Sequence, residues 1–247
     1  MPNRLAATVF ALAFAGVWSL PAATAEPTQV SLAPGAPLML GGTPRTSGEE
    51  IQMEACRLTA IGYDDEQRLV GITAGHCARI GRVVYSELVG RLGQLGQVVR
   101  VHHDMGIPAE MDMSRPWHED IDFAIIEFDQ AKVVPSAAAR VGGNDVKVAD
   151  VGGAPKVGDK ACQSGRTTSN VCGTVTEVQD WQHRAEFCTS EGDSGAPVFV
   201  GDRIVGLVTT ALKTKENACG TELGSNLDAV LEAIGPGVGE GFQPFVG

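Results

Sequence analysis

Short apolar or alternating runs, separated by glycines and charged turns, dominate the chain from Met53 onward. Runs of this length and pattern are typical of β-strands. They cover residues 69–72, 98–101, 123–128, 171–178, 197–200 and 204–209. No long alternation of strand-like and helix-like segments occurs, which disfavours a parallel sheet covered by helices. The pattern therefore predicts an all-β fold.

One helix is predicted near the end of the chain. Asn226 is a suitable N-cap for a helix whose apolar face includes Leu227 and Val230. Gly235-Pro236 would end this helix, since glycine and proline commonly follow a helix C-terminus. We expect the tail, 237–247, to be poorly ordered.

The N-terminus has the pattern of a secretory signal peptide over 1–25. Arg4 supplies a positive charge, an apolar stretch follows it, and Ala23-Thr24-Ala25 is a cleavage site of small residues. A membrane anchor is the alternative, but the short apolar stretch and the cleavage site favour removal of the segment. Residues 26–50 are rich in Pro, Gly, Thr and Ala, and we expect a loosely ordered leader or short pro-segment there.

Cysteine content and charge narrow the class of protein further. Six cysteines in an exported chain predict three disulfides, whose connectivity the sequence alone leaves open. A zinc site is disfavoured because no Cys-x-x-Cys pair occurs.

The formal net charge of -11 argues against binding to nucleic acid or to an anionic membrane, since both need clustered Lys and Arg. We expect a secreted, extracellular protein, in solution or at the cell envelope, with no stable membrane insertion after removal of the signal.

The segment Gly192-Asp193-Ser194-Gly195 indicates nucleophilic catalysis. A serine hydroxyl becomes a useful nucleophile only when a base takes its proton and fixed donors hold the oxyanion. The glycines would let the backbone bend so that the amides of Gly192 and Ser194 point at one spot. An α/β-hydrolase elbow is disfavoured, because it needs Gly-x-Ser-x-Gly and Ala196 stands at the last position.

Two upstream segments offer a base and an acid. The base is His76, within Thr73-Ala74-Gly75-His76-Cys77. The acid is Asp122, which precedes an apolar run, with Asp120 as the rival two residues earlier. Alternate residues of a strand share a face, so alternation cannot separate these two carboxylates.

The pair Ala74-Gly75-His76-Cys77 and Gly192-Asp193-Ser194-Gly195, in that order, resembles the chymotrypsin-like serine proteases. The segments 162–168 and 171–175 are similar to the secreted bacterial members, the streptogrisin and α-lytic group. The resemblance covers roughly 56–226 of the chain. It implies two antiparallel six-stranded β-barrels with a short C-terminal helix, and a site in the cleft between the barrels. We expect the N-terminal barrel over 51–140 and the C-terminal barrel, with helix and tail, over 141–247.

The resemblance also implies roles for the candidate residues. Ser194 would be the nucleophile, His76 the general base and Asp122 the acid that orients His76, in the chain order His, Asp, Ser. The family places the acid directly before x-Ala-Ile/Leu, which selects Asp122 over Asp120. No metal or organic cofactor is implied, and a metal site at His102, His103 and Asp104 is a weak alternative.

The same resemblance implies a disulfide pairing. It selects Cys56–Cys77, Cys162–Cys172 and Cys188–Cys219. Each bridge closes a loop of modest length, so we expect each to stabilise the fold by roughly 2–4 kcal/mol.

Asp193 needs a positive partner if it is buried beside the oxyanion amides. The bacterial relatives place an arginine directly after the first cysteine of the Cys-x-Ser-Gly segment, but that position is Gln163 here. Arg166 is the nearest substitute in the sequence, and we expect an Arg166–Asp193 ion pair.

Substrate selection is expected to depend on Thr209, Thr210 and Ala211. In the relatives this edge pairs with the substrate backbone as an added β-strand. Its last two residues there are usually Gly-Gly, so Thr210 and Ala211 would crowd a large P1 side chain. No clear acid at the base of the pocket is recognisable in the sequence, which predicts a small or medium apolar P1 residue.

These observations predict a secreted, monomeric serine endopeptidase that hydrolyses polypeptide substrates through an acyl-enzyme. A secreted esterase-like acyl hydrolase using the same triad is the first alternative. A catalytically silent protease fold that serves only for binding is the second.

Overall fold

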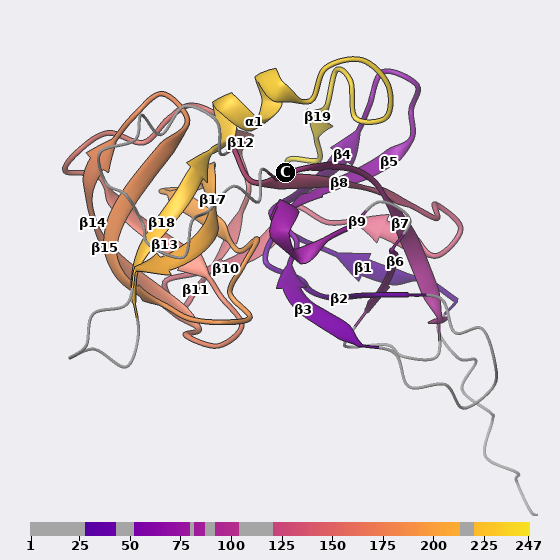
Figure 1. Cartoon of the computed structure of the whole chain (residues 1–247), viewed down its shortest axis with the longest axis horizontal. Coiled ribbons are helices and arrows are strands. Elements are labelled where there is room, and N and C mark those ends of the chain that lie inside the picture. Colours follow the sequence, from indigo (N-terminus) through magenta and orange to yellow (C-terminus); the bar gives the residue numbers. More distant parts are fainter. Residues whose placement is uncertain (1–27, 43–51, 80–81, 87–91, 104–120, 213–219) are drawn as a thin grey trace, which may run out of the picture.

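The computed structural model describes residues 28–42, 52–79, 82–86, 92–103, 121–212 and 220–247, and it shows two β-barrels side by side (Figure 1). In this part of the chain α1 (Leu227–Ala233) is the one α-helix. No helix among these residues is long and apolar enough to cross a membrane.

The first barrel is an antiparallel sheet that closes on a bent strand. Its strands are β2 (Pro37–Gly41), β3 (Met53–Arg57), β4 (Ala60–Tyr63), β5 (Leu69–Thr73), β6 (Val83–Ser86), β7 (Gln94–His102) and β8 (Phe123–Phe128). They pair in the order β4-β5-β8-β7-β6-β2-β3. Only Leu58 and Thr59 separate β3 from β4; the Leu58 amide donates to Ala36 on the β2 side and the Thr59 amide donates to Ile72 of β5. Because β3 and β4 act as one bent strand, the barrel has six strands.

The second barrel closes through a direct strand pairing. Its strands are β13 (Lys160–Ser164), β14 (Asn170–Val178), β15 (Gln182–Thr189), β16 (Pro197–Val200), β17 (Arg203–Leu212) and β18 (Gly220–Asn226). They pair in the order β17-β16-β13-β14-β15-β18, and β17 pairs with β18 to complete the circle. The prediction of two antiparallel six-stranded barrels with a short C-terminal helix is confirmed.

The expectation of a loosely ordered leader is wrong for the part of 26–50 that the structure describes. Here β1 (Val30–Leu32) pairs in parallel with β9 (Val133–Pro135), and β2 lies between β3 and β6. Leu38 and Leu40 of β2 are both 0% exposed. They are alternate residues of one strand, so they face the core together. The Pro- and Gly-rich composition conceals this short alternating strand.

The segment between the barrels is a hairpin. Strands β10 (Ala138–Val141) and β11 (Asn144–Lys147) pair with each other, and the predicted boundary between 140 and 141 falls within β10. A short strand, β12 (Asp150–Val151), then pairs in parallel with β17 and leads into the second barrel.

The tail after α1 is ordered, contrary to expectation, and returns to the first barrel. Its strand β19 (Gln243–Pro244) pairs with β4. The Phe245 amide donates to Ile61, and the Gly247 amide donates to Val148. The glycines of the tail allow the turns, while the backbone of β4 supplies the hydrogen-bond partners.

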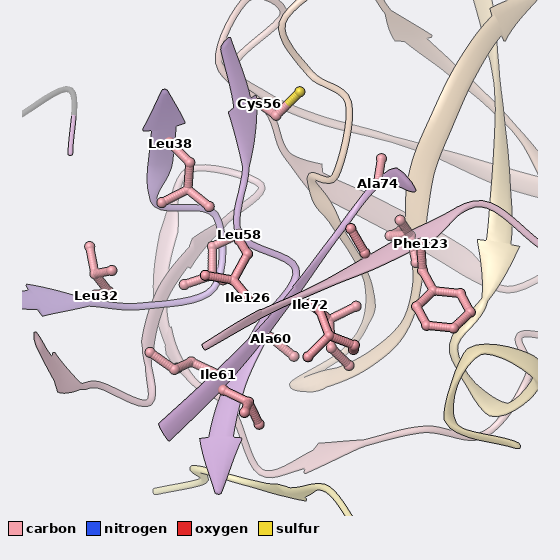
Figure 2. Packing of buried hydrophobic residues seen from close by; sticks show 14 of the residues in the cluster. Leu32, Leu38, Cys56, Leu58, Ala60, Ile61, Ile72, Ala74, Phe123 and Ile126 are labelled. Atoms are coloured by element: carbon pink, nitrogen blue, oxygen red, sulfur yellow. The ribbon is translucent and has the colours of Figure 1, made fainter. Parts of the chain in front are cut away.

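A tightly packed core supports the first barrel where the predicted site begins. Figure 2 shows Leu38, Leu58, Ile72 and Ile126 packed in this cluster, together with Ala74 and Phe123. Ala74 lies two residues before His76, and Phe123 directly follows Asp122. Both candidate residues are therefore attached to buried neighbours that can barely move, since protein cores are close-packed.

Candidate active site

The structure brings the three predicted triad side chains into one hydrogen-bonded chain. His76 Nδ1 lies 2.6 Å from Asp122 Oδ2, and His76 Nε2 lies 2.8 Å from Ser194 Oγ. The His76 amide also donates to Asp122 Oδ1, over 2.8 Å. Two bonds to one carboxylate hold both the backbone and the ring of His76.

Local structure explains how the first barrel presents His76 and Asp122. The 3₁₀ turn η1 (Gly75–Cys77) is separated from β5 by Ala74 alone, and Asp122 directly precedes β8. Strands β5 and β8 pair with each other, with Thr73 opposite Ala124. Their adjoining ends therefore carry the base and the acid side by side, and the Cys56–Cys77 disulfide ties the turn to β3.

Electrostatics keep Asp122 ionised. Burial by itself raises the pKa of its carboxyl, but hydrogen bonds from His103 and His76 outweigh burial and lower the pKa to about 2. An ionised carboxylate only accepts hydrogen bonds, so His76 Nδ1 must carry a proton. In the neutral ring Nε2 is then an acceptor, correctly placed for the Ser194 hydroxyl.

His103 also lies at this carboxylate, a contact that sequence reasoning missed because it named His103 only in the alternative metal site. His103 Nδ1 is 3.1 Å from Asp122 Oδ1, and its ring centroid is 6.0 Å from that of His76. It directly follows β7, the strand paired with β8, but no local motif marks it. The adjacent His102 instead stacks on Phe123 at 5.4 Å. The two histidines of the alternative metal site thus contact different groups, His103 the Asp122 carboxylate and His102 the Phe123 ring. The third member of that site, Asp104, lies outside the described residues.

The nucleophile loop is anchored to both barrels. The Arg57 amide in the first barrel donates to the Ser194 carbonyl, and the Gly195 amide donates to Val208 of β17. Gly195 has φ +77°, and a Cβ there would lie 2.4 Å from the Arg57 carbonyl oxygen, so only glycine fits. Within the described residues, neither Gly192 nor Ser194 donates its amide to a backbone carbonyl.

Asp193 is fully buried and held by neutral donors. Its carboxylate accepts the Thr167 amide at 2.6 Å, the Thr168 hydroxyl at 2.7 Å and the Ser190 amide at 3.1 Å. The predicted Arg166–Asp193 pair is not among the ion pairs of the residues that the structure describes. A turn that presents several amides can solvate a buried carboxylate without a cation.

Gln163, which breaks the family pattern, supports this arrangement. Its side chain is buried, and Nε2 donates to the Thr168 hydroxyl and, over 3.1 Å, to the Cys188 carbonyl. The Thr168 hydroxyl can thus accept from Gln163 while it donates to Asp193. Gly165 allows the close approach, because a Cβ there would lie 2.7 Å from Asp193 Oδ1.

The predicted substrate edge is part of β17. Its pairing with β16 ends at Leu207, while its pairing with β18 continues through Thr210 and Ala211. Over these last residues β17 is thus paired on one side only in the described structure. The Thr209 hydroxyl donates to the Leu223 carbonyl at 2.9 Å, so this side chain is turned toward β18.

A buried ion pair behind this edge is a second feature that sequence reasoning missed. Glu222 of β18 lies opposite Ala211, and its Oε1 is 3.3 Å from His183 Nε2. Asn226 Oδ1 accepts a hydrogen bond from His183 Nδ1 over 2.9 Å, and the Ala185 amide donates to Glu222. Burial lowers the pKa of His183, but the charge and hydrogen bond of Glu222 outweigh it and the pKa is raised.

Two of the predicted disulfides, Cys56–Cys77 and Cys162–Cys172, are present. Cys188 is also disulfide-bonded, and its predicted partner, Cys219, lies outside the described residues. The second bridge joins opposite positions of β13 and β14.

Comparisons with known proteins give the fold. The sequence matches no family model and no curated protein. Thermobifida fusca Protease A is 19% identical, with a TM-score of 0.62, covering 88% of this chain and 100% of its own. Nocardiopsis protease is 18% identical, with a TM-score of 0.58, covering 83% and 96%. Cellulomonas bogoriensis chymotrypsin is 22% identical, with a TM-score of 0.56, also covering 83% and 96%. The chain therefore has the fold of the chymotrypsin-like bacterial serine proteases.

Proposed function

We propose that the protein is a serine endopeptidase that cleaves polypeptides through a covalent acyl-enzyme. The observation that carries the proposal is the continuous chain of hydrogen bonds from Asp122 through His76 to the Ser194 hydroxyl, with distances of 2.6 Å and 2.8 Å. These lengths suit proton transfer from the hydroxyl to the ring. The shared fold with proteases supports the same reaction class.

In the proposed mechanism Ser194 Oγ attacks the substrate carbonyl carbon while its proton moves to His76 Nε2. The amides of Gly192 and Ser194 would stabilise the oxyanion. His76 then gives the proton to the leaving amine as the C–N bond breaks and the acyl-enzyme forms. Water, deprotonated by His76, attacks the acyl carbon, and Ser194 Oγ departs with the proton. Asp122 stays ionised and stabilises the protonated ring.

The substrate is proposed to add as a strand along the open side of β17, at Thr209–Ala211. We infer a small or medium apolar P1 side chain. Thr210 and Ala211 have side chains at positions where the family usually has glycine, and these side chains would crowd a large P1 residue. Glu222, near this edge, is fully buried and paired with His183, so it offers no free charge to a basic P1 residue. A peptide-library profile dominated by Arg, Lys or Glu at P1 would contradict this preference.

Secretion is part of the proposal. A signal peptide over 1–25 would deliver the chain to an oxidising compartment, where disulfides such as Cys56–Cys77 persist. Sequencing the N-terminus of secreted protein tests this point, and a mature chain that retains Met1 would contradict it.

The central test replaces the nucleophile. Ser194→Ala should lower turnover of peptide substrates by a factor on the order of 10⁶, as in another serine protease. Ser136→Ala, at a half-buried position of the connecting segment, is the matched control and should keep wild-type turnover. If Ser194→Ala retains turnover, the proposed mechanism is wrong.

Labelling with a fluorophosphonate separates an enzyme from a silent binding module. The wild type should be labelled at Ser194, and His76→Ala should lose labelling because the hydroxyl loses its base. A wild type that does not react would favour the silent module. Comparing turnover of matched ester and amide substrates separates the protease from an esterase-like acyl hydrolase.

A further inference from the structure

We propose that His103 is a positioning residue that holds the Asp122 carboxylate in its productive orientation for His76. The inference rests on the proposed function, because it assigns His103 a part in the proton relay. The observation behind it is the 3.1 Å contact between His103 Nδ1 and Asp122 Oδ1. No residue of the sequence motifs supplies this contact.

The two oxygens of Asp122 are held from different directions. Oδ2 accepts His76 Nδ1 at 2.6 Å, while Oδ1 accepts the His76 amide at 2.8 Å and faces His103. Rotation of the carboxylate would break the contacts at both oxygens together. The donor from His103 therefore adds a restraint on the rotation of the carboxylate that orients the His76 ring.

The environment makes this contact effective. The side chains of Asp122 and His103 are 10% and 13% exposed, so little water competes for the hydrogen bond. The low pKa of Asp122, about 2, keeps the carboxylate ionised and an acceptor only. His103 Nδ1 must then be the donor, as His76 Nδ1 is. One carboxylate thus sets the tautomer of two rings.

His103 also shares the charge of the carboxylate. Its ring lies at the Asp122 carboxylate and 6.0 Å, between ring centroids, from His76. A donor at Oδ1 withdraws negative charge from the oxygen that faces His76. Without this donor the carboxylate would hold the protonated His76 ring more strongly. The active, neutral ring would then be lost at a higher pH.

The test compares His103→Phe with His103→Gln. His103→Phe keeps a planar ring but has no donor, so kcat should fall about tenfold, while KM changes less than about twofold. The acid limb of the kcat/KM pH profile should move to higher pH by roughly half a unit. His103→Gln can donate an amide N–H to Oδ1, so it should recover most of kcat and return the acid limb toward wild type.

The chain offers a matched control in the adjacent residue. His102→Phe removes a neighbouring histidine whose ring stacks on Phe123, and it should keep wild-type kcat and the wild-type acid limb. Thermal unfolding of each variant separates loss of folded protein from loss of turnover. Unchanged kcat and acid limb in His103→Phe would overturn the inference. Equal losses in His103→Phe, His103→Gln and His102→Phe, with no shift of the acid limb, would also overturn it.

A measurement that needs no turnover keeps this inference distinct from the proposed function. The NMR resonance of the His76 Nδ1 proton reports its hydrogen bond to Asp122. It should shift or broaden in His103→Phe and keep its wild-type position in His102→Phe. An unchanged resonance in His103→Phe would overturn the positioning role even in an active protease. A shifted resonance in a protein that never labels with fluorophosphonate would support the positioning role and reject only the protease.

Discussion

Gly75 is a residue at which the predicted triad leaves little room for a side chain. A Cβ on Gly75 would lie 2.5 Å from the His102 carbonyl oxygen and 2.7 Å from Asp122 Oδ1. Neither atom can move far, since both adjoin the packed end of the first barrel. The side chain of an alanine there would push the carboxylate away from His76.

Gly75→Ala should therefore lower kcat at least tenfold in the molecules that remain folded. Gly96→Ala is the matched control, because its Cβ would lie 2.5 Å from the Glu127 carbonyl oxygen in the same barrel, away from the triad. Both variants should melt at lower temperature, but Gly96→Ala should keep its turnover per folded molecule. Kinetics normalised to the folded fraction decide the outcome, and wild-type turnover in Gly75→Ala would contradict this account.

At the scale of elements, the pairing of β15 with β18 buries a charged pair in the second barrel. His183 and Glu222 are 1% and 0% exposed. The pKa of His183 is raised because the attraction of Glu222 outweighs burial. His183 thus binds a proton more tightly in the folded state than in the unfolded state. The stabilisation is fully present below the unfolded pKa, about 6.5, and is lost as pH rises through the folded-state pKa.

Glu222→Gln should remove the stabilisation that this pair provides at low pH. It deletes the charge but keeps an oxygen for the Ala185 amide, so it should lower the free energy of unfolding at about pH 6 by roughly 3 kcal/mol. The difference from wild type should shrink as pH rises. Urea unfolding at a series of pH values measures it, and a difference that stays constant with pH would contradict the prediction.

An exposed pair on the same sheet provides the control. Glu177 pairs with Arg184 at 2.8 Å, but its side chain is 55% exposed. Exposed pairs stabilise folds by at most about 1 kcal/mol. Glu177→Gln should therefore leave the free energy of unfolding nearly unchanged across the same pH series.

At the scale of the whole molecule, the C-terminal tail joins the two halves of the chain. After α1 the tail passes from the second barrel to the first, where β19 pairs with β4 and covers its edge. Figure 1 shows α1 and β19 bridging the top of the two barrels. Deleting 243–247 would leave that edge unpaired, and unpaired edges promote aggregation.

The deletion should lower the free energy of unfolding by about 2–4 kcal/mol, at roughly 1 kcal/mol for each backbone hydrogen bond lost. It should also increase aggregation near the melting temperature. Phe245→Ala is the control, because this side chain is 39% exposed, while the hydrogen bond from the backbone amide of residue 245 to the Ile61 carbonyl would remain. Calorimetry and light scattering test the prediction, and a deletion variant that melts like Phe245→Ala would contradict it.

The sequence by itself was sufficient to predict features that depend on a few consecutive residues. The alternation of apolar and polar residues predicted the strands, and the resemblance carried by the segments around His76 and Ser194 led to the two-barrel fold. The same resemblance selected the Cys56–Cys77 and Cys162–Cys172 bridges. The roles of the triad residues remain part of the proposal. These signals are readable because turn geometry and strand alternation are local properties of a chain.

Only the tertiary structure decided the features that depend on pairing between distant strands. His103 reaches Asp122 because β7 pairs with β8, and Glu222 meets His183 because β15 pairs with β18. The tail is ordered because β19 pairs with β4, and the buried Asp193 carboxylate accepts the Thr167 amide from a turn that is distant in the sequence. Such contacts form when the barrels close and bring together residues that are far apart in the sequence. The local sequence around each residue does not indicate its partner.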